Sequence, residues 1–125
     1  MKNHTEIDQC LSTRDGHLFI EDCDTVALAE EFGSPLFVIS EKQLRQNVRS
    51  FRNAFSAHWP DGDVEVLPAI KANWILAVRK ILTEEGAGAD IYSYGELHAA
   101  LESNVTPEMI SVNGGGKQED LIEKC

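Results

Sequence analysis

A lysine that closes an apolar segment is the residue of this sequence best suited to covalent chemistry. Lys71 follows VEVLPAI, residues 64–70, which has the length and apolar character of a strand. In α/β barrels the carboxyl ends of the strands carry the reactive groups, so a strand-end amine lies where a cofactor or substrate would bind. Desolvation there lowers the pKa of an amine and makes it a nucleophile that can form a Schiff base with a carbonyl. The alternative is an ordinary lysine that points into solvent.

Two carboxylates follow in the next predicted strand and helix. Asp90 lies inside the otherwise apolar strand of residues 89–92, and a carboxylate buried there must be paired or hydrogen-bonded. Lys71, on the neighbouring strand, is its expected partner. Glu96 completes the sequence Ser93-Tyr94-Gly95-Glu96, a capping box that opens a helix. A helix that begins after a barrel strand faces the active-site end, so the capping and catalytic roles of Glu96 can coexist.

The glycine-rich segment Asn113-Gly114-Gly115-Gly116-Lys117 suggests a phosphate-binding loop at first sight. The Walker motif needs a glycine at position 111 and a serine or threonine at position 118, where this chain has Ser111 and Gln118. The segment is therefore expected to be a flexible turn between a strand and a helix.

Four successive strand-then-helix units are predicted to position these side chains. The expected strands are residues 36–39, 64–70, 89–92 and 110–113. The first of the following helices begins at the N-cap Ser40, and the last begins near Gln118. A strand at 17–21 and a helix that starts after Asp24 or Thr25 and ends at Gly33 precede them. Short apolar strands that alternate with helices predict a parallel sheet with helices outside it.

The apolar side chains indicate which faces of these elements are buried. The predicted inner stripe of the helix after Ser40 consists of Leu44, Val48, Phe51 and Phe55. The predicted inner face of the last helix consists of Leu121 and Ile122. The predicted inward-facing strand residues are Phe37, Val66, Ile70, Ile91 and Val112.

The length of 125 residues leaves two architectures open. A doubly wound open sheet would be complete at this size, whereas a closed barrel of roughly 200 residues or more would be only half built. The glycine fingerprint G-x-G-x-x-G, which would favour the open sheet, is absent from the sequence.

The charge balance limits the classes of partner. With 11 Lys and Arg against 21 Asp and Glu, the formal net charge is −10 and the pI is about 4.7. Nucleic acid and anionic membranes both require a basic face, so neither is expected as a partner. The one basic run, Lys42, Arg45, Arg49 and Arg52, has helical spacing and is predicted to be the solvated face of a helix.

The sequence also predicts a compartment and a redox state. No apolar stretch has the length that a bilayer demands, and no hydrophobic region follows the first lysine, so we expect a cytoplasmic protein. Cys10, Cys23 and Cys125 are an odd set without a CxxC spacing. Neither a disulfide framework nor a zinc site is therefore expected.

Four ordered motifs resemble a known family. Residues 33–39 (GSPLFVI), 69–73 (AIKAN), 86–97 (GAGADIYSYGEL) and 110–117 (ISVNGGGK) are similar to successive motifs of the fold-type III pyridoxal-phosphate-dependent amino-acid decarboxylases. Within the ornithine, diaminopimelate and arginine decarboxylase family, the resemblance is closest to the diaminopimelate decarboxylases. It extends from about residue 17 to the last residue.

The resemblance implies a fold, a cofactor and three site residues. The implied fold is the amino-terminal half of a (β/α)8 TIM barrel of the alanine racemase type, with parallel strands and outer helices. Residues 1–33 would contribute to a β-rich domain, and residues 34–125 would form the first four βα units of the barrel. The family lysine that binds pyridoxal 5'-phosphate covalently falls on Lys71, and the acidic residues near the cofactor fall on Asp90 and Glu96. No metal site is implied.

The resemblance further implies an amino-acid substrate, a role in lysine biosynthesis and a homodimer for the full-length family. Pro68, Trp74 and Tyr94 depart from the usual family residues and leave the identity of the substrate open. The alternatives are a racemase or another amino-acid enzyme on the same barrel, or a catalytically inactive decarboxylase-like binding protein or remnant.

Overall fold

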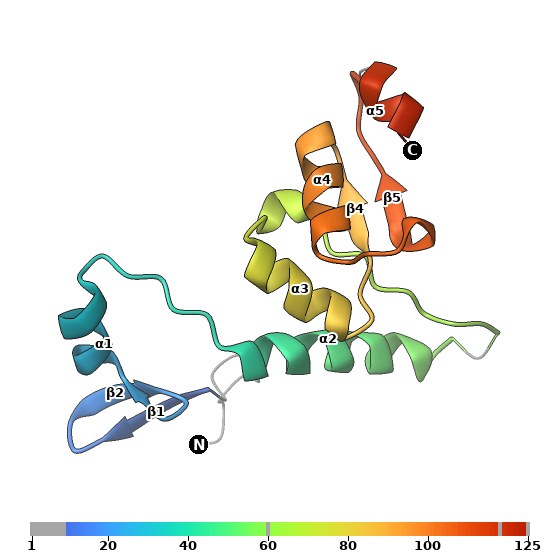
Figure 1. The fold of residues 1–125 in the computed structure, drawn as a ribbon. Coiled ribbons are helices and arrows are strands. Elements are labelled where there is room, and N and C mark those ends of the chain that lie inside the picture. Colours follow the sequence, from blue (N-terminus) through green and yellow to red (C-terminus); the bar gives the residue numbers. More distant parts are fainter. Residues whose placement is uncertain (1–9, 60, 118, 125) are drawn as a thin grey trace. The chain divides into compact units, whose positions relative to one another are not determined.

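The computed structural model describes residues 10–59, 61–117 and 119–124 (Figure 1). The chain divides into two compact units, Met1–Gln43 and Leu44–Cys125. The predicted boundary between residues 33 and 34 stays a prediction, and residues 1–9 of the predicted first domain lie outside the described residues.

The first unit contains a small antiparallel sheet with a helix. The strands β1 (Leu11–Arg14), β2 (His17–Ile20) and β3 (Cys23–Asp24) pair in that order. Asp15 and Gly16, both with positive φ, form the two-residue turn between β1 and β2. The predicted cap of the helix α1 (Thr25–Phe32) is confirmed, because the Asp24 carboxylate accepts the N–H of Val26 at 2.9 Å.

The strand predicted at residues 36–39 is not formed. These residues have no regular secondary structure, and Phe37 is 96% exposed, so its prediction as an inner barrel residue is wrong for this structure. An apolar run becomes a strand only where a neighbouring backbone accepts and donates its hydrogen bonds. No such neighbour is formed by the described residues.

The helix α2 (Glu41–Ser56) begins where the sequence predicted, since the Ser40 hydroxyl accepts the N–H of Gln43 at 2.9 Å. Its apolar stripe is only partly buried. Val48 packs in a small core with Val78, Leu82 and Ala87, as predicted for this stripe. Phe51 and Phe55 are instead more than half exposed and pack against each other, with ring centroids 4.8 Å apart.

The basic run of α2 is solvated only in part, which corrects the prediction: Lys42 and Arg49 are exposed, but the three arginines of the run also bind defined partners. Arg45 and Arg49 both bind the carboxylate of Glu85, the residue that caps the carboxyl end of helix α3 (Leu76–Glu84). Arg45 also binds Glu84 at 2.6 Å, and Arg52 donates to the main-chain carbonyl of Glu85 at 2.7 Å. The three arginines therefore attach α2 to the end of α3.

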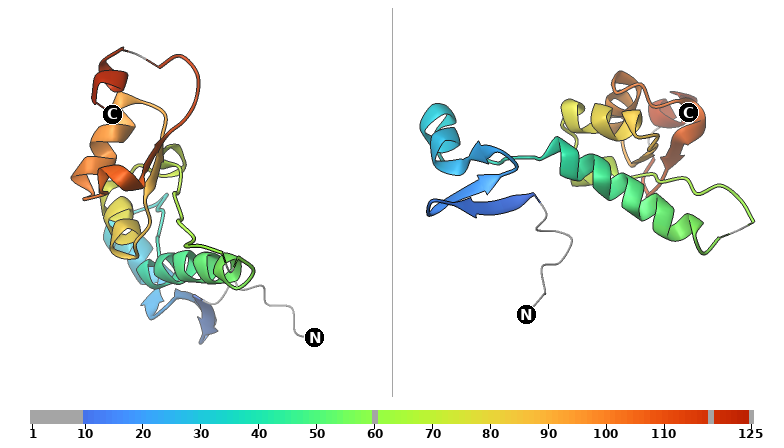
Figure 2. Two further views of the ribbon diagram at one scale, coloured as in Figure 1. Left: turned by 90° about the vertical axis from the view of Figure 1, so that its right-hand side faces the viewer. Right: turned by 90° about the horizontal axis from the view of Figure 1, so that it is seen from below.

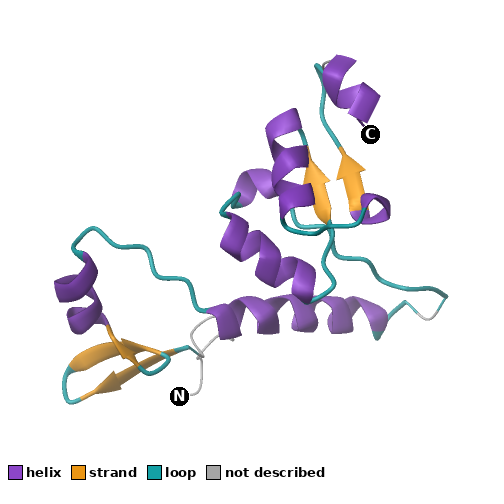
Figure 3. Ribbon diagram, in the orientation of Figure 1, coloured by secondary structure: helices purple, strands orange, loops and turns teal. Residues whose placement is uncertain are grey.

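The second unit also contains a parallel strand pair with helices beside it (Figures 1 and 3). The strands β4 (Ala89–Ile91) and β5 (Ile110–Val112) are joined through helix α4 (Tyr94–Glu102) and the short 3-10 helix η3 (Pro107–Met109). Helix α5 (Glu119–Lys124) follows β5, and Figure 2 shows α3 and α4 packed side by side. The predicted start of α5 at Gln118 lies outside the described residues.

The strand predicted at residues 64–70 is present only as a fragment. Residues 61–69 form an extended, irregular segment (Figure 2), and a single bridge joins Ala69 to Asp90 in the parallel sense. The chain then enters the 3-10 helix η2 (Ile70–Ala72). Pro68 has no N–H, so the ladder to β4 cannot continue regularly through this segment.

The larger of the two cores in the second unit is formed mainly by β4 and α4, and β5 packs against it. Ile70 and Ile91 are fully buried there, as predicted, and Leu121 is 2% exposed. Val112 packs against this core, whereas Ile122, also predicted to be inside, is 60% exposed. Leu121 and Ile122 are adjacent in α5, so their side chains project about 100° apart and only Leu121 faces this core.

Candidate functional site

Lys71 lies immediately after the segment that pairs with β4. Its neighbour Ile70 is fully buried, while Lys71 itself is exposed in the single turn of η2. The side-chain oxygen of Asn73 accepts the N–H of Ile75 at 3.1 Å and ends this turn. The buried isoleucine therefore anchors the backbone, and the lysine next to it remains accessible.

Asp90 occupies the centre of β4 and has a defined partner. It is half-buried between Ala89 and Ile91, both fully buried. The side-chain amide of Asn113 donates to its carboxylate at 2.5 Å, and the N–H of Asn113 donates to the carbonyl of Ile91 at 2.8 Å. In the described part of the chain no ion pair joins Asp90 to Lys71, so the predicted partner is replaced by Asn113 in this structure.

Glu96 performs the predicted capping, with one difference in detail. The Ser93 hydroxyl accepts the N–H of Glu96 at 3.3 Å, which confirms the N-cap of α4. The carboxylate of Glu96 accepts the N–H of Tyr92 at 2.7 Å, one residue before the cap. A capping box would place this bond on the cap residue itself. Glu96 therefore fixes the backbone at the point where β4 ends.

The strand register brings these residues to one edge. Ala69 pairs with Asp90, and Asp90 pairs with Ser111, all in the parallel sense. Because the ends of parallel strands meet at the same edge of a sheet, Lys71 and Asn113, each two residues further along, lie at the carboxyl edge. An exposed primary amine, a carboxylate held by an amide and a second carboxylate at this edge fit a ligand that carries an aldehyde.

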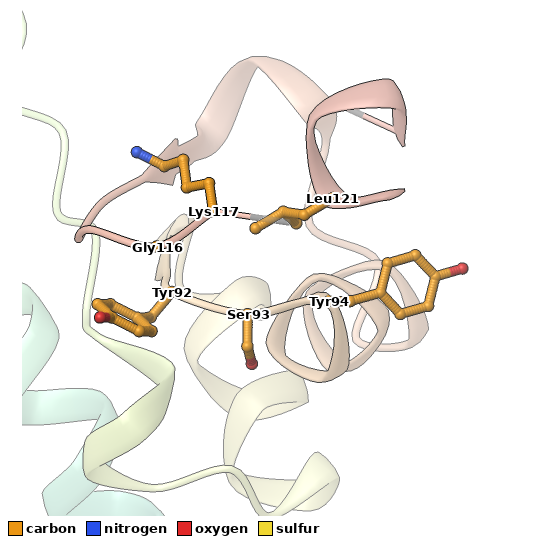
Figure 4. Close-up of a pocket in the computed structure, with 6 residues that line it drawn as sticks. All are labelled: Tyr92, Ser93, Tyr94, Gly116, Lys117 and Leu121. Atoms are coloured by element: carbon orange, nitrogen blue, oxygen red, sulfur yellow. The ribbon is translucent and has the colours of Figure 1, made fainter. Parts of the chain in front are cut away.

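A small cavity opens at the same edge (Figure 4). It has a volume of about 210 Å³ and lies between the end of β4 and the turn before α5. This volume is below the roughly 300–1,000 Å³ of a complete small-molecule site. Its polar side chains, those of Ser93, Lys117 and the two tyrosines, do not converge, because Figure 4 shows Lys117 and Tyr94 directed away from each other. The cavity is thus part of a site at most. Its lining residues are Tyr92, Ser93, Tyr94, Gly116, Lys117 and Leu121.

The glycine-rich turn after β5 packs tightly against one aromatic ring. Gly114 has a φ of +88°, and a Cβ added to it would lie 1.8 Å from the ring of Tyr92. Gly115, the next residue, has no neighbouring atom within 4 Å of such a Cβ. The glycine at position 114 is therefore required by both conformation and contact.

Other kinds of site find no support in the part of the chain described. Its His, Cys, Asp and Glu residues form no cluster of three or more that could hold a metal ion. Cys10 and Cys23 are free thiols, and Cys125 lies outside the described residues. None of the helices described has the length and apolar character needed to cross a membrane.

Two residues of this region were missed at the sequence level. Asn113 was assigned only to the end of a strand, and an asparagine in that position gives no signal of its partner. Arg79, on α3, was not singled out at all. It is 1% exposed, and its guanidinium binds the main-chain carbonyls of Pro68 and Gly88. The available signal was Pro68, since a proline in a predicted strand leaves a neighbouring carbonyl without a donor.

Comparison with known proteins yields consistent matches over most of the chain. The sequence model of a family described as pyridoxal-dependent decarboxylase, pyridoxal binding domain, matches residues 41–125. A diaminopimelate decarboxylase of Methanothermobacter thermautotrophicus is 42% identical over 108 residues, which are 86% of this chain and 25% of the relative. One from Methanocaldococcus jannaschii is 40% identical over 111 residues, 87% of this chain and 25% of the relative. The chain thus spans about a quarter of the length of these curated relatives.

Solved structures give the same result for the fold. A crystal structure of diaminopimelate decarboxylase from M. jannaschii superposes with a TM-score of 0.88 at 37% identity, covering 93% of this chain and 27% of that one. A second structure of that enzyme, in complex with L-lysine, has a TM-score of 0.86 at 38% identity, with 92% of this chain and 27% of that one covered. The predicted fold, an amino-terminal portion of the barrel with parallel strands and outer helices, is confirmed.

Proposed function

Because the chain belongs to the family of pyridoxal-dependent decarboxylases, we propose that it is the amino-terminal, cofactor-binding part of a pyridoxal-phosphate-dependent amino-acid decarboxylase. One observation carries this proposal. The segment that ends at the exposed Lys71 pairs with β4, the strand that contains Asp90. The polypeptide that carries this chain is called the full-length protein below.

The proposed roles follow from the chemistry of each side chain. The Lys71 amine, exposed at the end of the paired segment, would hold the cofactor covalently. Asp90, oriented by Asn113, would balance the positive charge of the amine when it is released. Glu96 would keep the backbone at the end of β4 in place through the N–H of Tyr92. Pyridoxal phosphate, when bound, supplies the electron sink that makes loss of CO2 from an amino acid possible.

Diaminopimelate is the proposed substrate, supported by the relatives that carry the name diaminopimelate decarboxylase at 40–42% identity. An amino-acid ligand is also supported by the related enzyme that was crystallised with L-lysine. A homodimer in the cytoplasm, without nucleic acid or membrane partners, is proposed on the same family basis.

Chemical trapping of the cofactor tests the central role. The full-length protein is loaded with pyridoxal phosphate, reduced with borohydride and digested for peptide mapping. We expect the pyridoxyl group on Lys71, because its amine is exposed at the end of the segment that pairs with β4. A Lys80→Met variant is the matched control, since Lys80 is an exposed lysine on α3, and it should label like the unmodified protein. Labelling of Lys80 or Lys117 with Lys71 unmodified would overturn the proposal.

A further inference from the structure

Arg79 is a buried cation without a carboxylate partner. Its residue is 1% exposed, and in the described part of the chain no ion pair includes it. One guanidinium nitrogen, Nη2, donates to the carbonyl of Gly88 at 2.8 Å, and Nη1 lies 3.4 Å from the carbonyl of Pro68. The third nitrogen, Nε, is buried and has no hydrogen-bond partner among the described residues. Burial lowers the pKa of this guanidinium, so the position is costly for a cation and calls for a reason.

The reason lies in the ladder between residues 66–69 and β4. The N–H of Gly88 donates to the carbonyl of Val66 at 2.9 Å, and the N–H of Asp90 donates to the carbonyl of Pro68 at 3.3 Å. In a parallel ladder the carbonyl of Gly88 would then accept the N–H of residue 68. Residue 68 is a proline and has no N–H. Without another donor, a carbonyl in this buried position would be left unpaired.

We propose that Arg79 is a positioning residue that supplies the donor missing at Pro68 and so holds the segment bearing Lys71 against the strand bearing Asp90. Its two contacts are on the residues that lie three positions before Lys71 and two positions before Asp90. An apolar side chain at position 79 would avoid the cost of burying a cation but would leave the carbonyl of Gly88 without a partner. Proline and arginine therefore form a compensating pair.

The consequence for the site depends on the proposed function, whereas the pairing itself does not. If Lys71 holds the cofactor, a looser ladder moves its amine relative to Asp90 and lowers the yield of the reduced pyridoxyl product. If Lys71 has no such role, the ladder still loosens. Measurements of the backbone and of the lysine therefore separate the two claims.

The experiment uses four variants of the full-length protein: Arg79→Met, Pro68→Ala, the double variant, and Lys80→Met as a control on the exposed face of α3. Hydrogen exchange is followed at the amides of Gly88 and Asp90, and pyridoxyl labelling at Lys71. Removing the donor should speed both exchange rates by about tenfold, because an unpaired buried carbonyl opens the local structure. The double variant, in which position 68 regains an N–H, should return both rates and the labelling to the values of Pro68→Ala. Lys80→Met should change none of them.

Every other outcome contradicts either the pairing of Arg79 with Pro68 or the proposed function of Lys71. Exchange in Arg79→Met that equals the unmodified protein overturns the proposal, and so does a double variant that exchanges as fast as Arg79→Met. If Arg79→Met does not fold, the double variant must fold, and its failure to do so also overturns the proposal. Rescue of exchange together with labelling at a lysine other than 71 leaves the pairing valid and overturns the proposed function instead.

Discussion

Asp90 has two candidate partners, and their energetics differ. The Asn113 amide lies 2.5 Å from its carboxylate, while Lys71 is exposed to water. An exposed ion pair contributes about 0.2–1 kcal/mol, whereas a hydrogen bond to a charged group contributes about 1.5–3 kcal/mol. Asn113 therefore determines the orientation of Asp90, and the lysine amine is left available for reaction.

We expect Asn113→Ala to lower the free energy of unfolding of the cofactor-free, full-length protein by about 1.5 kcal/mol, the low end for a bond to a charged group that is partly open to water. Lys71→Met should cost less than about 1 kcal/mol. Urea denaturation measures both. Asn113→Asp provides a further check, since two adjacent carboxylates repel each other and should be less stable than the alanine variant at neutral pH. A larger loss for Lys71→Met than for Asn113→Ala would contradict this ranking.

At the scale of elements, the contact between α2 and the end of α3 depends on charge. The carboxyl end of a helix carries partial negative charge, so the carboxylate of Glu85 in that position is unfavourable alone. Hydrogen bonds from Arg49 and Arg45 offset this, and they lower the pKa of Glu85 from 4.5 to about 2. The ionised carboxylate thus holds two successive turns of α2.

The stabilisation from Glu85 should depend on pH in a defined direction. Its pKa in the folded chain is below its usual value, so the contribution is complete above about pH 4.5 and is lost as the pH falls through about 2. We expect Glu85→Gln to lower the urea midpoint at neutral pH and to have a much smaller effect near pH 2. Glu84→Gln is the control, because its half-exposed carboxylate binds Arg45 alone and should matter less. An effect of Glu85→Gln that is independent of pH would contradict the role assigned to the ion pairs.

Helices and their caps could be predicted from the sequence more completely than strands. Asp24, Ser40 and Ser93 all cap helices as predicted, because capping depends on residues within one turn. Strand formation at residues 36–39 depends on a neighbouring backbone, which a local pattern does not contain. In the same way, Lys71, Asp90 and Glu96 were identified from type and position. Asn113 binds Asp90, 23 residues away, and Arg79 binds Pro68, 11 residues away. A local sequence pattern does not contain such distant partners.

At the scale of the whole molecule, large apolar side chains remain exposed in both units. Phe37 in the first unit is 96% exposed, and Trp74 in the second is 76% exposed. Burial of such a side chain stabilises a protein by about 1.5–3 kcal/mol, so several exposed ones remove a large part of a usual stability of about 5–15 kcal/mol. Among the residues that the structure describes, β5 pairs only with β4, so its other side offers unpaired backbone groups.

We therefore expect the isolated 125-residue chain to self-associate and to lack decarboxylase activity. It should bind pyridoxal phosphate only weakly, through the reversible chemistry open to any exposed lysine. Size-exclusion chromatography and cofactor titration measure these properties, with the full-length protein as the control. A compact monomer that binds the cofactor stoichiometrically and decarboxylates an amino acid would contradict the proposal that this chain is the amino-terminal part of a larger barrel.

The contrast between Gly114 and Gly115 has a practical consequence. The first is locked by its positive φ and by the ring of Tyr92, while the second faces open space. Two adjacent positions that look interchangeable in the printed sequence therefore differ in their tolerance of change. In a variant whose three native cysteines are replaced, position 115 can receive a cysteine for a fluorescent label, because no atom lies within 4 Å of a Cβ added there. Since position 115 lies in the turn that follows β5, two residues after Asn113, we expect a dye attached there to respond to changes at the carboxyl end of β5.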